Sequence, residues 1–428
     1  MQQGIPMKLT QVQSTPESEV VLCCSRTHLD AKAIERVTAL LERELDWENL
    51  IRLAFMHGVL PLVYSNIRKR WLEALPETIS HQLQKHFQAN VQRNLFLTAE
   101  LLKLLKAFEM HGLEAVPFKG PVLAASAYGD VTLRQFGDLD ILVHRRDILE
   151  AGQLIVSQGY RPSLTEGDAS DDHKPDPDEI AFVGPQYYTF NRHDRRSRVD
   201  LQWRISEQYF AFSLDEKPLW ERLTAVSVAG RSVRTFAPTD MLLILCVHGS
   251  KHRWEKLKWV CDVAELVRAH KREIDWEKIQ QQACKQGIQR MLRLGLFLAR
   301  ELVEADLPAE ISKQAFGDAT TKRLAQQIRE RLFTPADRPL GKLKRVIFFI
   351  RTKDHWLEGG KFCLRYISQY CRAVVTPTPV ERESLPLPMS LSFVHVVFRP
   401  LRLTVKYCWL GAIRICRWRT RGAGNLAG

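Results

Sequence analysis

The sequence has no long apolar run, and no uninterrupted apolar stretch reaches the length of about 18 residues that a membrane-spanning helix requires. It also lacks any Cys-x-x-Cys pair, although it contains 9 cysteines. The first absence argues against a transmembrane helix, and the second against a zinc ribbon or a disulfide framework. Residues 1–19 lack the apolar segment of a secretory signal. We therefore expect a cytoplasmic protein with reduced thiols.

Acidic residues are scarce near the end of the chain, where residues 341–428 contain 16 Lys and Arg against 4 Asp and Glu. The formal net charge of the whole sequence is +13, so residues 1–340 are nearly neutral. A nearly neutral body lacks the electrostatic attraction on which nucleic-acid binding depends. We therefore do not expect the main body to bind nucleic acid.

The distribution of apolar residues, Pro and Gly divides the sequence into consecutive regions. We expect a polar leader over residues 1–28, a helical domain over 29–110, a mixed core over 111–237, a second helical domain over 238–334 and a basic, Pro-interrupted tail over 335–428. The predicted fold class is α+β, with a small mixed β-sheet flanked by N-terminal and C-terminal helical regions.

Two periodicities locate the individual elements. Apolar residues at helical spacing predict helices over residues 31–45, 46–71, 77–110, 122–128, 148–158, 239–249, 257–270, 276–286 and 289–303, with Asp46 as an N-cap. Short apolar or alternating runs predict strands over residues 113–118 and 139–143, and hairpins that pair 186–191 with 198–203 and 225–228 with 232–236. The second hairpin turns at Ala229-Gly230.

Two aspartates at the start of the 139–143 strand carry the strongest chemical signal. Side chains alternate along a strand, so Asp138 and Asp140 project to the same face, roughly 6.5–7 Å apart at the backbone. Asp200, in the later strand, offers a third carboxylate. Hard oxygen ligands of this kind suit Mg²⁺ or Mn²⁺. We predict that Asp138 and Asp140 bridge the metal ions, and that Asp200 binds the one that activates an attacking hydroxyl and accepts its proton.

Phosphates need backbone donors and positive charge, which the sequence provides upstream. Lys119 and Gly120 lie where a predicted strand turns into a helix, so turn amides and the helix N-terminus can face an anion. Arg134 is a second candidate for a triphosphate. Pro121 follows directly, so one amide contact is either lost or replaced by Lys119.

This arrangement of motifs resembles the DNA polymerase beta-type nucleotidyltransferase superfamily, which combines a strand, a Gly-containing turn, a helix, a strand with Asp-x-Asp and a third acid on a later strand. The chain resembles more closely a bacterial family of uncharacterised nucleotidyltransferases. That resemblance rests on residues 46–47, 57–59, 118–120, 128, 134, 137–143, 199–203, 248–262 and 399–402. It implies a nucleotidyltransferase core in the mixed domain, with an NTP as substrate.

Two histidines in the predicted helix 239–249 and just beyond it raise three alternatives. His248 and His252, four residues apart, could together bind a metal. His248, Lys251 or His252 could instead line the nucleotide cleft, with Asp262 pairing to one of them. The third alternative is a cluster at a helix end that faces solvent. The sequence favours the second and third over a zinc site, because no third ligand lies nearby.

The predicted reaction is Mg²⁺-dependent transfer of a nucleotidyl group from an NTP to a hydroxyl or phosphate of a protein, peptide or saccharide. Two alternatives stay open at this point. One is a non-catalytic, antitoxin-like nucleotide-binding protein, and the other is a scaffold of a surface-polymer or peptide-maturation system.

The basic tail contains a regular pattern of cations. Six of them between residues 399 and 421 fall within an arc of about 120° on a helix. A helix with such a stripe suits an anionic membrane surface, and this predicts peripheral contact with the inner face of the membrane. The alternative is a helix that packs on the body with its arginines in water.

Overall fold

The computed structural model describes residues 15–163, 187–205, 216–333, 342–354 and 359–361, together with residues 363, 364 and 368. The chain forms two compact units, residues 1–359 and residues 360–428, and all elements described below belong to the first. The predicted membrane-binding stripe at 399–421 lies outside the described residues.

A five-stranded mixed sheet forms the centre of the first unit. Its strands are β1 (Ala115–Pro117), β2 (Leu139–Val143), β3 (Tyr160–Pro162), β4 (Tyr187–Arg192) and β5 (Arg198–Gln202), in the spatial order β1-β2-β5-β4-β3. Only β2 and β5 pair in parallel; the other neighbours are antiparallel. The small mixed sheet confirms the predicted fold class.

The second predicted hairpin is also present, as strands β6 (Thr224–Val228) and β7 (Arg231–Thr235). Both turn residues have positive φ, 49° at Ala229 and 78° at Gly230, as a type I′ turn requires. The hydroxyl of Thr235 donates to the carbonyl of Pro117 at 2.7 Å. This bond attaches the hairpin to the β1 edge of the sheet.

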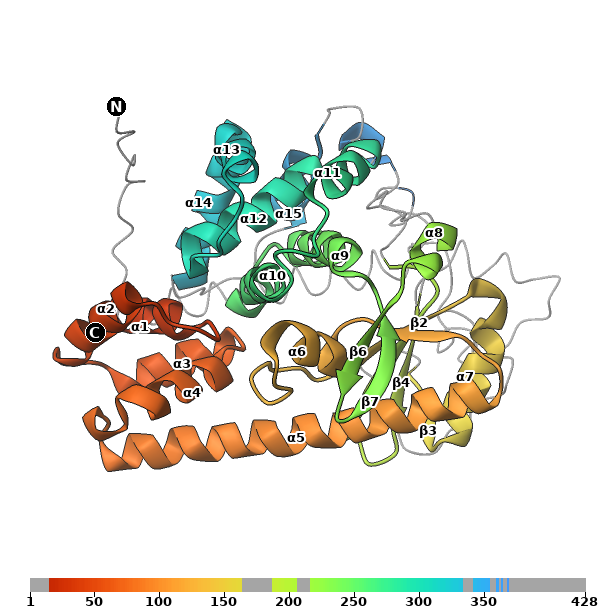
Figure 1. Ribbon diagram of the computed structural model, residues 1–428, viewed down its shortest axis with the longest axis horizontal. Coiled ribbons are helices and arrows are strands. Elements are labelled where there is room, and N and C mark those ends of the chain that lie inside the picture. Colours follow the sequence, from red (N-terminus) through yellow and green to blue (C-terminus); the bar gives the residue numbers. More distant parts are fainter. Residues whose placement is uncertain are drawn as a thin grey trace, which may run out of the picture. The chain divides into compact units, whose positions relative to one another are not determined.

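One face of the sheet packs on helices α5 (Glu77–Met110) and α7 (Ile148–Ser157). Helix α5, predicted over the same residues, contains 34 residues and is about 51 Å long (Figure 1). Its buried residues Leu97, Leu101, Leu104 and Phe108 recur at helical spacing and share one apolar core with strand residues such as Ile141. Helix α5 therefore supports the sheet that carries the predicted carboxylates.

The N-terminal helices are α1 (Pro16–Cys24), α2 (Ala31–Leu41), α3 (Trp47–Met56) and α4 (Leu60–Arg70), followed by the short η1 (Leu72–Ala74). Asp46 caps α3 as predicted, because its carboxylate accepts a hydrogen bond from the Asn49 amide at 2.9 Å. The apolar pattern of residues 46–71 belongs to two helices and not one, since Gly58 adopts φ of 68° between them.

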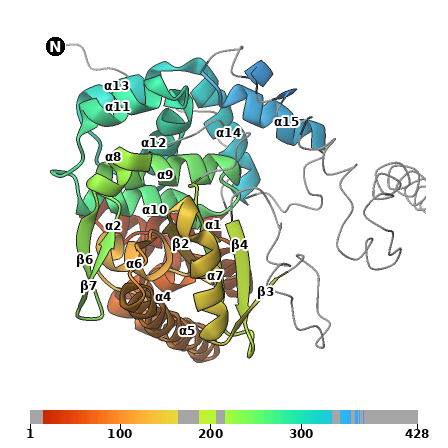
Figure 2. The same ribbon diagram turned by 90° about the vertical axis from the view of Figure 1, so that its right-hand side faces the viewer.

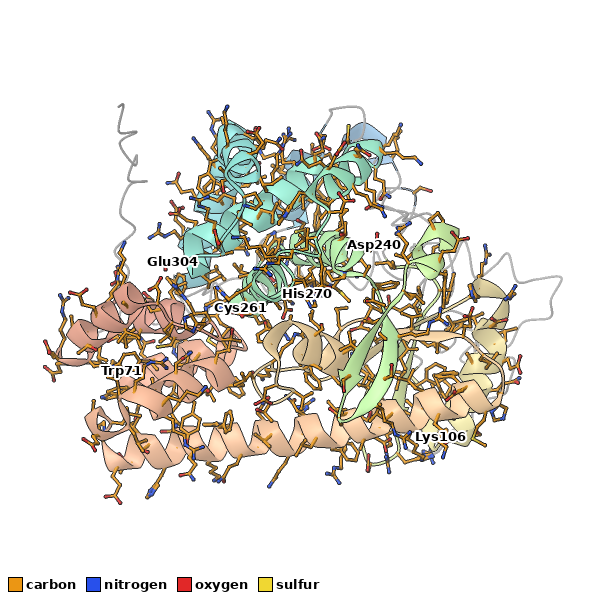
Figure 3. The ribbon with its side chains drawn as sticks, in the orientation of Figure 1. Trp71, Lys106, Asp240, Cys261, His270 and Glu304 are labelled. Atoms are coloured by element: carbon orange, nitrogen blue, oxygen red, sulfur yellow. The ribbon has the colours of Figure 1, made fainter. Side chains whose placement is uncertain are left out.

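Helix α1 corrects the prediction of a polar leader over residues 1–28. Thr15 caps this helix, and Val20 and Val21 are completely buried. The sequence prediction missed this helix because its apolar run is short and follows polar residues. The segment after α1 contacts the C-terminal helices: Arg26 pairs with Glu304 at 2.6 Å, and the Cys261 thiol donates to the Ser25 carbonyl. Figure 3 labels Glu304 and Cys261.

The C-terminal helices are α8 (Glu216–Glu221), α9 (Pro238–Lys251), α10 (Leu257–Ala269), α11 (Trp276–Lys285), α12 (Gln289–Val303), α13 (Ala309–Gly317), α14 (Ala319–Phe333) and α15 (Lys342–Arg351). Helices α9 to α12 agree with the four predicted helices, whereas α8 and α13 to α15 had not been predicted. Helices α9 and α10 lie between α6 (Gly120–Tyr128) and the α11–α14 group (Figures 1 and 2). None of the described helices combines the length and the apolarity needed to cross a bilayer.

Candidate active site

The three predicted carboxylates lie close together at the interior strands β2 and β5 of the sheet. In the parallel pair β2·β5, Asp140 is directly opposite Asp200. Asp138 immediately precedes β2, two positions before Asp140, so strand alternation gives both the same face. The side chains of Leu139 and Ile141 belong to the apolar core on the opposite side. The structure places these three acids near one another, and their catalytic role stays a prediction.

Asp140 is held by two donors. Its Oδ1 lies 2.9 Å from Lys119 Nζ and accepts a hydrogen bond from Gln202 Nε2 at 2.8 Å. Only 6% of the Asp140 side chain and 13% of the Lys119 side chain are exposed, so this is a nearly buried ion pair. The contact of Gln202 was missed from the sequence. Its position two residues after Asp200, on the same strand face, is the signal that could have found it.

Asp200 has its own set of partners. Its Oδ1 accepts hydrogen bonds from Thr189 Oγ1 at 2.8 Å and from Arg198 Nε at 3.0 Å. Thr189 is directly opposite Asp200 on β4, and Arg198 is two residues before it on β5. Neither residue was predicted for the site. Together they fix the orientation of the third carboxylate.

The environment separates the pKa values of the first two carboxyl groups. Burial acts to raise the pKa of Asp138, but the charges of Lys119, Lys258 and other nearby cations outweigh it and lower this pKa. The pKa of Asp140 is raised because burial, with the charges of Asp138 and Asp200, exceeds the attraction of Lys119. Three carboxylates therefore share this part of the sheet with several cations.

Lys119 and Gly120 lie at the predicted turn. Helix α6 begins at Gly120, with Lys119 as its N-cap residue and Pro121 in the first turn. Gly120 adopts φ of +53°, and a Cβ there would lie 3.3 Å from the carbonyl oxygen of Asp138. A glycine therefore lets the start of α6 approach the backbone that leads into β2. Because proline has no amide proton, Pro121 cannot donate to a phosphate.

Arg134 has a different partner from the one predicted. Its guanidinium forms two bonds to Asp262 on α10, at 2.7 and 2.9 Å, and Tyr128 donates to the same carboxylate at 2.7 Å. Asn94 of α5 donates to the Arg134 carbonyl at 2.7 Å. The guanidinium is buried and directed at Asp262, so the structure does not support the expected contact with a triphosphate. Arg134 instead links the loop before β2 to α10.

His248, Lys251 and His252 lie at the end of α9, with Lys258 and Trp259 at the start of α10. The His248 and His252 rings are 4.6 Å apart, and His252 stacks on Trp259 at 4.8 Å. We call these five residues the α9–α10 wall. Its helices bring together His248 and Lys251, both predicted for nucleotide binding, as well as Lys258, which the sequence analysis had not singled out.

The α9–α10 wall lies within electrostatic range of the Lys119 ammonium group. Burial, followed by the charge of Lys119, lowers the pKa of His248 well below its usual value, and burial with Lys251 and Lys119 lowers that of His252 to about 3. Burial and the charge of Arg134 lower the pKa of Lys258 to about 8. Both imidazoles are therefore neutral near pH 7, and cations surround them.

Within the described part of the chain, no three His, Cys, Asp or Glu side chains are arranged to hold a metal ion. The donor chemistry nevertheless fits Mg²⁺ or Mn²⁺, because carboxylate oxygens from neighbouring register positions are the hard ligands that these ions prefer. Asp138 and Asp140 would hold the ion, with Asp200 beside them. Lys119 would then have to leave the Asp140 oxygen that it now contacts.

Comparison with protein families identifies the chain. A family model described as uncharacterised nucleotidyltransferase matches residues 43–304. The chain belongs to this nucleotidyltransferase family. The matched range extends from before α3 to the end of α12, and it contains the three carboxylates, the Lys119 turn and the α9–α10 wall. A search among curated proteins finds no match. Membership assigns nucleotidyl transfer as the general activity and an NTP as the substrate, as the sequence resemblance implied.

Proposed function

We propose that this nucleotidyltransferase moves a nucleotidyl group from an NTP, in a reaction dependent on Mg²⁺ or Mn²⁺, to a hydroxyl or phosphate on a protein, peptide or saccharide. The observation that carries the proposal is the register of β2 and β5, which places Asp140 opposite Asp200 beside Lys119. The same arrangement supports membership of the DNA polymerase beta-type superfamily.

The α9–α10 wall and the Lys119 turn supply the positive charge that a triphosphate needs. Lys119, Lys251 and Lys258 all act electrostatically on His248, so the three ammonium groups converge on one region. Lys119 also lies beside the carboxylates, because its Nζ contacts Asp140 at 2.9 Å. An NTP whose phosphates lie between these groups would direct its α-phosphorus toward the carboxylates.

For a hydroxyl acceptor, the acceptor oxygen forms a bond to the α-phosphorus while the bond from that phosphorus to the bridging oxygen of the β-phosphate breaks. Pyrophosphate leaves, and the hydroxyl proton passes to Asp200. Thr189 and Arg198 hold the Asp200 carboxylate in place during this transfer. A bound Mg²⁺ would polarise the phosphate oxygens and neutralise developing charge.

The decisive experiment incubates the purified full chain with each α-phosphate-labelled NTP, Mg²⁺ and a cell lysate. We expect release of pyrophosphate and a labelled acceptor, and loss of both in the Asp138→Asn, Asp140→Asn double variant. Glu150→Gln is the matched control, since it removes an exposed carboxylate on α7. Unchanged turnover in the double variant would contradict the site assignment.

One observation favours the alternative of a nucleotide-binding protein without transferase activity. The ion pair between Lys119 and Asp140 neutralises a carboxylate that the reaction would need. This alternative predicts that NTP binds without pyrophosphate release, so the labelling experiment separates it from the enzyme. Peripheral membrane contact through residues 399–421, in a cytoplasmic protein, is a further proposal, and co-sedimentation with anionic vesicles before and after deletion of residues 391–428 tests it.

A further inference from the structure

The Lys119 ammonium group contacts the Asp140 oxygen that a metal ion would bind. Lys119 Nζ lies 2.9 Å from Asp140 Oδ1, and the side chains of both residues are largely buried. A lysine ammonium and a divalent cation carry charge of the same sign, so they compete for this oxygen. Metal binding to Asp140 therefore requires Lys119 to move.

A second partner for Lys119 would be available at the α9–α10 wall. Its charge lowers the pKa of both His248 and His252, so the ammonium group lies within electrostatic range of the α9–α10 wall. That wall is where the proposed function puts the triphosphate. A phosphate oxygen there would give Lys119 a new negative partner when it leaves Asp140.

Asp140 does not lose its orientation when Lys119 leaves. Gln202 Nε2 donates to the same oxygen at 2.8 Å, and the backbone of Asp140 stays in the β2·β5 ladder. A single ammonium contact is also easier to exchange than a two-bond guanidinium pair. The geometry thus combines a movable cation with a fixed carboxylate.

We propose that Lys119 is an exchangeable occupant of the metal site, which pairs with Asp140 in the absence of nucleotide and transfers to the triphosphate when an NTP binds. The inference rests on the proposed function. Its consequence is positive coupling: nucleotide binding frees Asp140 for the metal, and metal binding frees Lys119 for the phosphates. By thermodynamic reciprocity, each ligand strengthens the binding of the other by the same factor.

The test measures Mn²⁺ binding to the full chain by electron paramagnetic resonance, with and without an NTP analogue that has a methylene group between its α- and β-phosphates. Lys119→Met removes the charge and keeps most of the side-chain length. We expect this variant to bind Mn²⁺ alone roughly tenfold more tightly than the unmodified chain. The enhancement of Mn²⁺ binding by the analogue should fall by the same factor.

Lys251→Met is the matched control, because it removes a cation of the α9–α10 wall that is not on Asp140. It should weaken analogue binding and leave the affinity for Mn²⁺ alone within about twofold of the unmodified chain. An equal gain in Mn²⁺ affinity in both variants would overturn the exchange and indicate a general charge effect. No gain in Lys119→Met would overturn it as well.

Asp140→Asn separates failure of this inference from failure of the proposed function. If Asp140→Asn loses Mn²⁺ binding while Lys119→Met binds Mn²⁺ as the unmodified chain does, only the exchange is wrong. If Asp140→Asn binds Mn²⁺ normally in the presence of the analogue, the metal site and the proposed function are wrong together. Circular dichroism and urea midpoints of all variants verify that each one is folded.

Discussion

Asp262 and Asp140 are both buried and paired with a cation, and their surroundings differ. Asp262 receives two bonds from Arg134 and one from Tyr128, and it joins α10 to the loop before β2. Asp140 receives one lysine contact and one amide hydrogen bond, at a place in the sheet where two further carboxylates lie close by. The Asp262 carboxylate therefore accepts three hydrogen bonds, two of them from one cation.

The difference between the two pairs shows how charge can serve structure in one place and chemistry in another. Asp262 accepts two hydrogen bonds from the forked Arg134 guanidinium and one from Tyr128, so it would gain little from another ligand. Asp140 retains negative neighbours and a raised pKa, so it would gain from a stronger cation. We therefore expect substitutions at Asp140 to affect activity and substitutions at Arg134 to affect stability.

The largest effect is expected for Asp140→Asn. Loss of this ligand should reduce pyrophosphate release roughly a thousandfold, because several kcal/mol of stabilisation by the metal are lost. The free energy of unfolding should change by about 1 kcal/mol or less, since the fold disfavours the ionised form of this buried carboxyl. Rates and urea unfolding of the same samples check both. Near-normal activity, or a variant that fails to fold, would contradict the assignment of Asp140 to activity and not to stability.

Arg134→Met tests whether the Arg134–Asp262 pair contributes to stability. It leaves the buried Asp262 carboxylate without its cation, so the free energy of unfolding should fall by about 3–5 kcal/mol. Urea denaturation measures this loss, and the double variant with Asp262→Asn should recover part of it. If the single variant kept full stability and only bound NTP more weakly, Arg134 would have the phosphate-binding role that the sequence suggested.

A pH titration of stability examines the α9–α10 wall. The pKa of His252 is lowered to about 3 by burial and by Lys251 and other cations, so the folded protein keeps this imidazole neutral while the unfolded chain protonates it below about pH 6.5. Stability from this residue is complete above that pH and is lost as the pH falls. Between pH 7 and pH 5 the loss is about 2 kcal/mol. His252→Gln should reduce the pH dependence of the urea midpoint accordingly; an unchanged slope would refute the assignment.

The smallest overall effect among these variants is expected at the two ends of α6. Gly120 and Gly129 both have positive φ, at 53° and 70°. Alanine at either position should cost about 1 kcal/mol of unfolding free energy from backbone strain. Only Gly120→Ala also brings a Cβ to 3.3 Å from the Asp138 carbonyl, whereas a Cβ at Gly129 meets nothing within 4 Å. Pyrophosphate release should therefore fall in Gly120→Ala alone, and equal losses would show that α6 as a whole matters.

Local signals predicted much of the fold. The continuous helical spacing of α5, the Ala229-Gly230 turn and the Asp46 cap each depend on residues that are close in sequence. The α1 helix was missed because its apolar run is short and follows polar residues. The split between α3 and α4 depends on a single left-handed residue, Gly58, which apolar spacing does not reveal.

The site was predicted in part for the same reason. Asp138 and Asp140 are two residues apart, so strand alternation was enough to place them together. The bond between Gln202 and Asp140 spans 62 residues, and the pair between Arg134 and Asp262 spans 128. Such long-range partners depend on strand register and helix packing, and no local pattern in one sequence distinguishes Arg134 as a structural link from Arg134 as a phosphate ligand.

Helix α5 has a practical consequence for dividing the chain. Its first half packs beside α4, where the Tyr64 and Phe87 rings are 5.0 Å apart, and its second half supplies Leu97, Leu101 and Phe108 to the sheet core. A fragment that started at residue 111, where sequence periodicity places a boundary, would leave those core positions uncovered. Such a fragment should aggregate when it is expressed alone, so the sheet and α5 have to be produced as one piece.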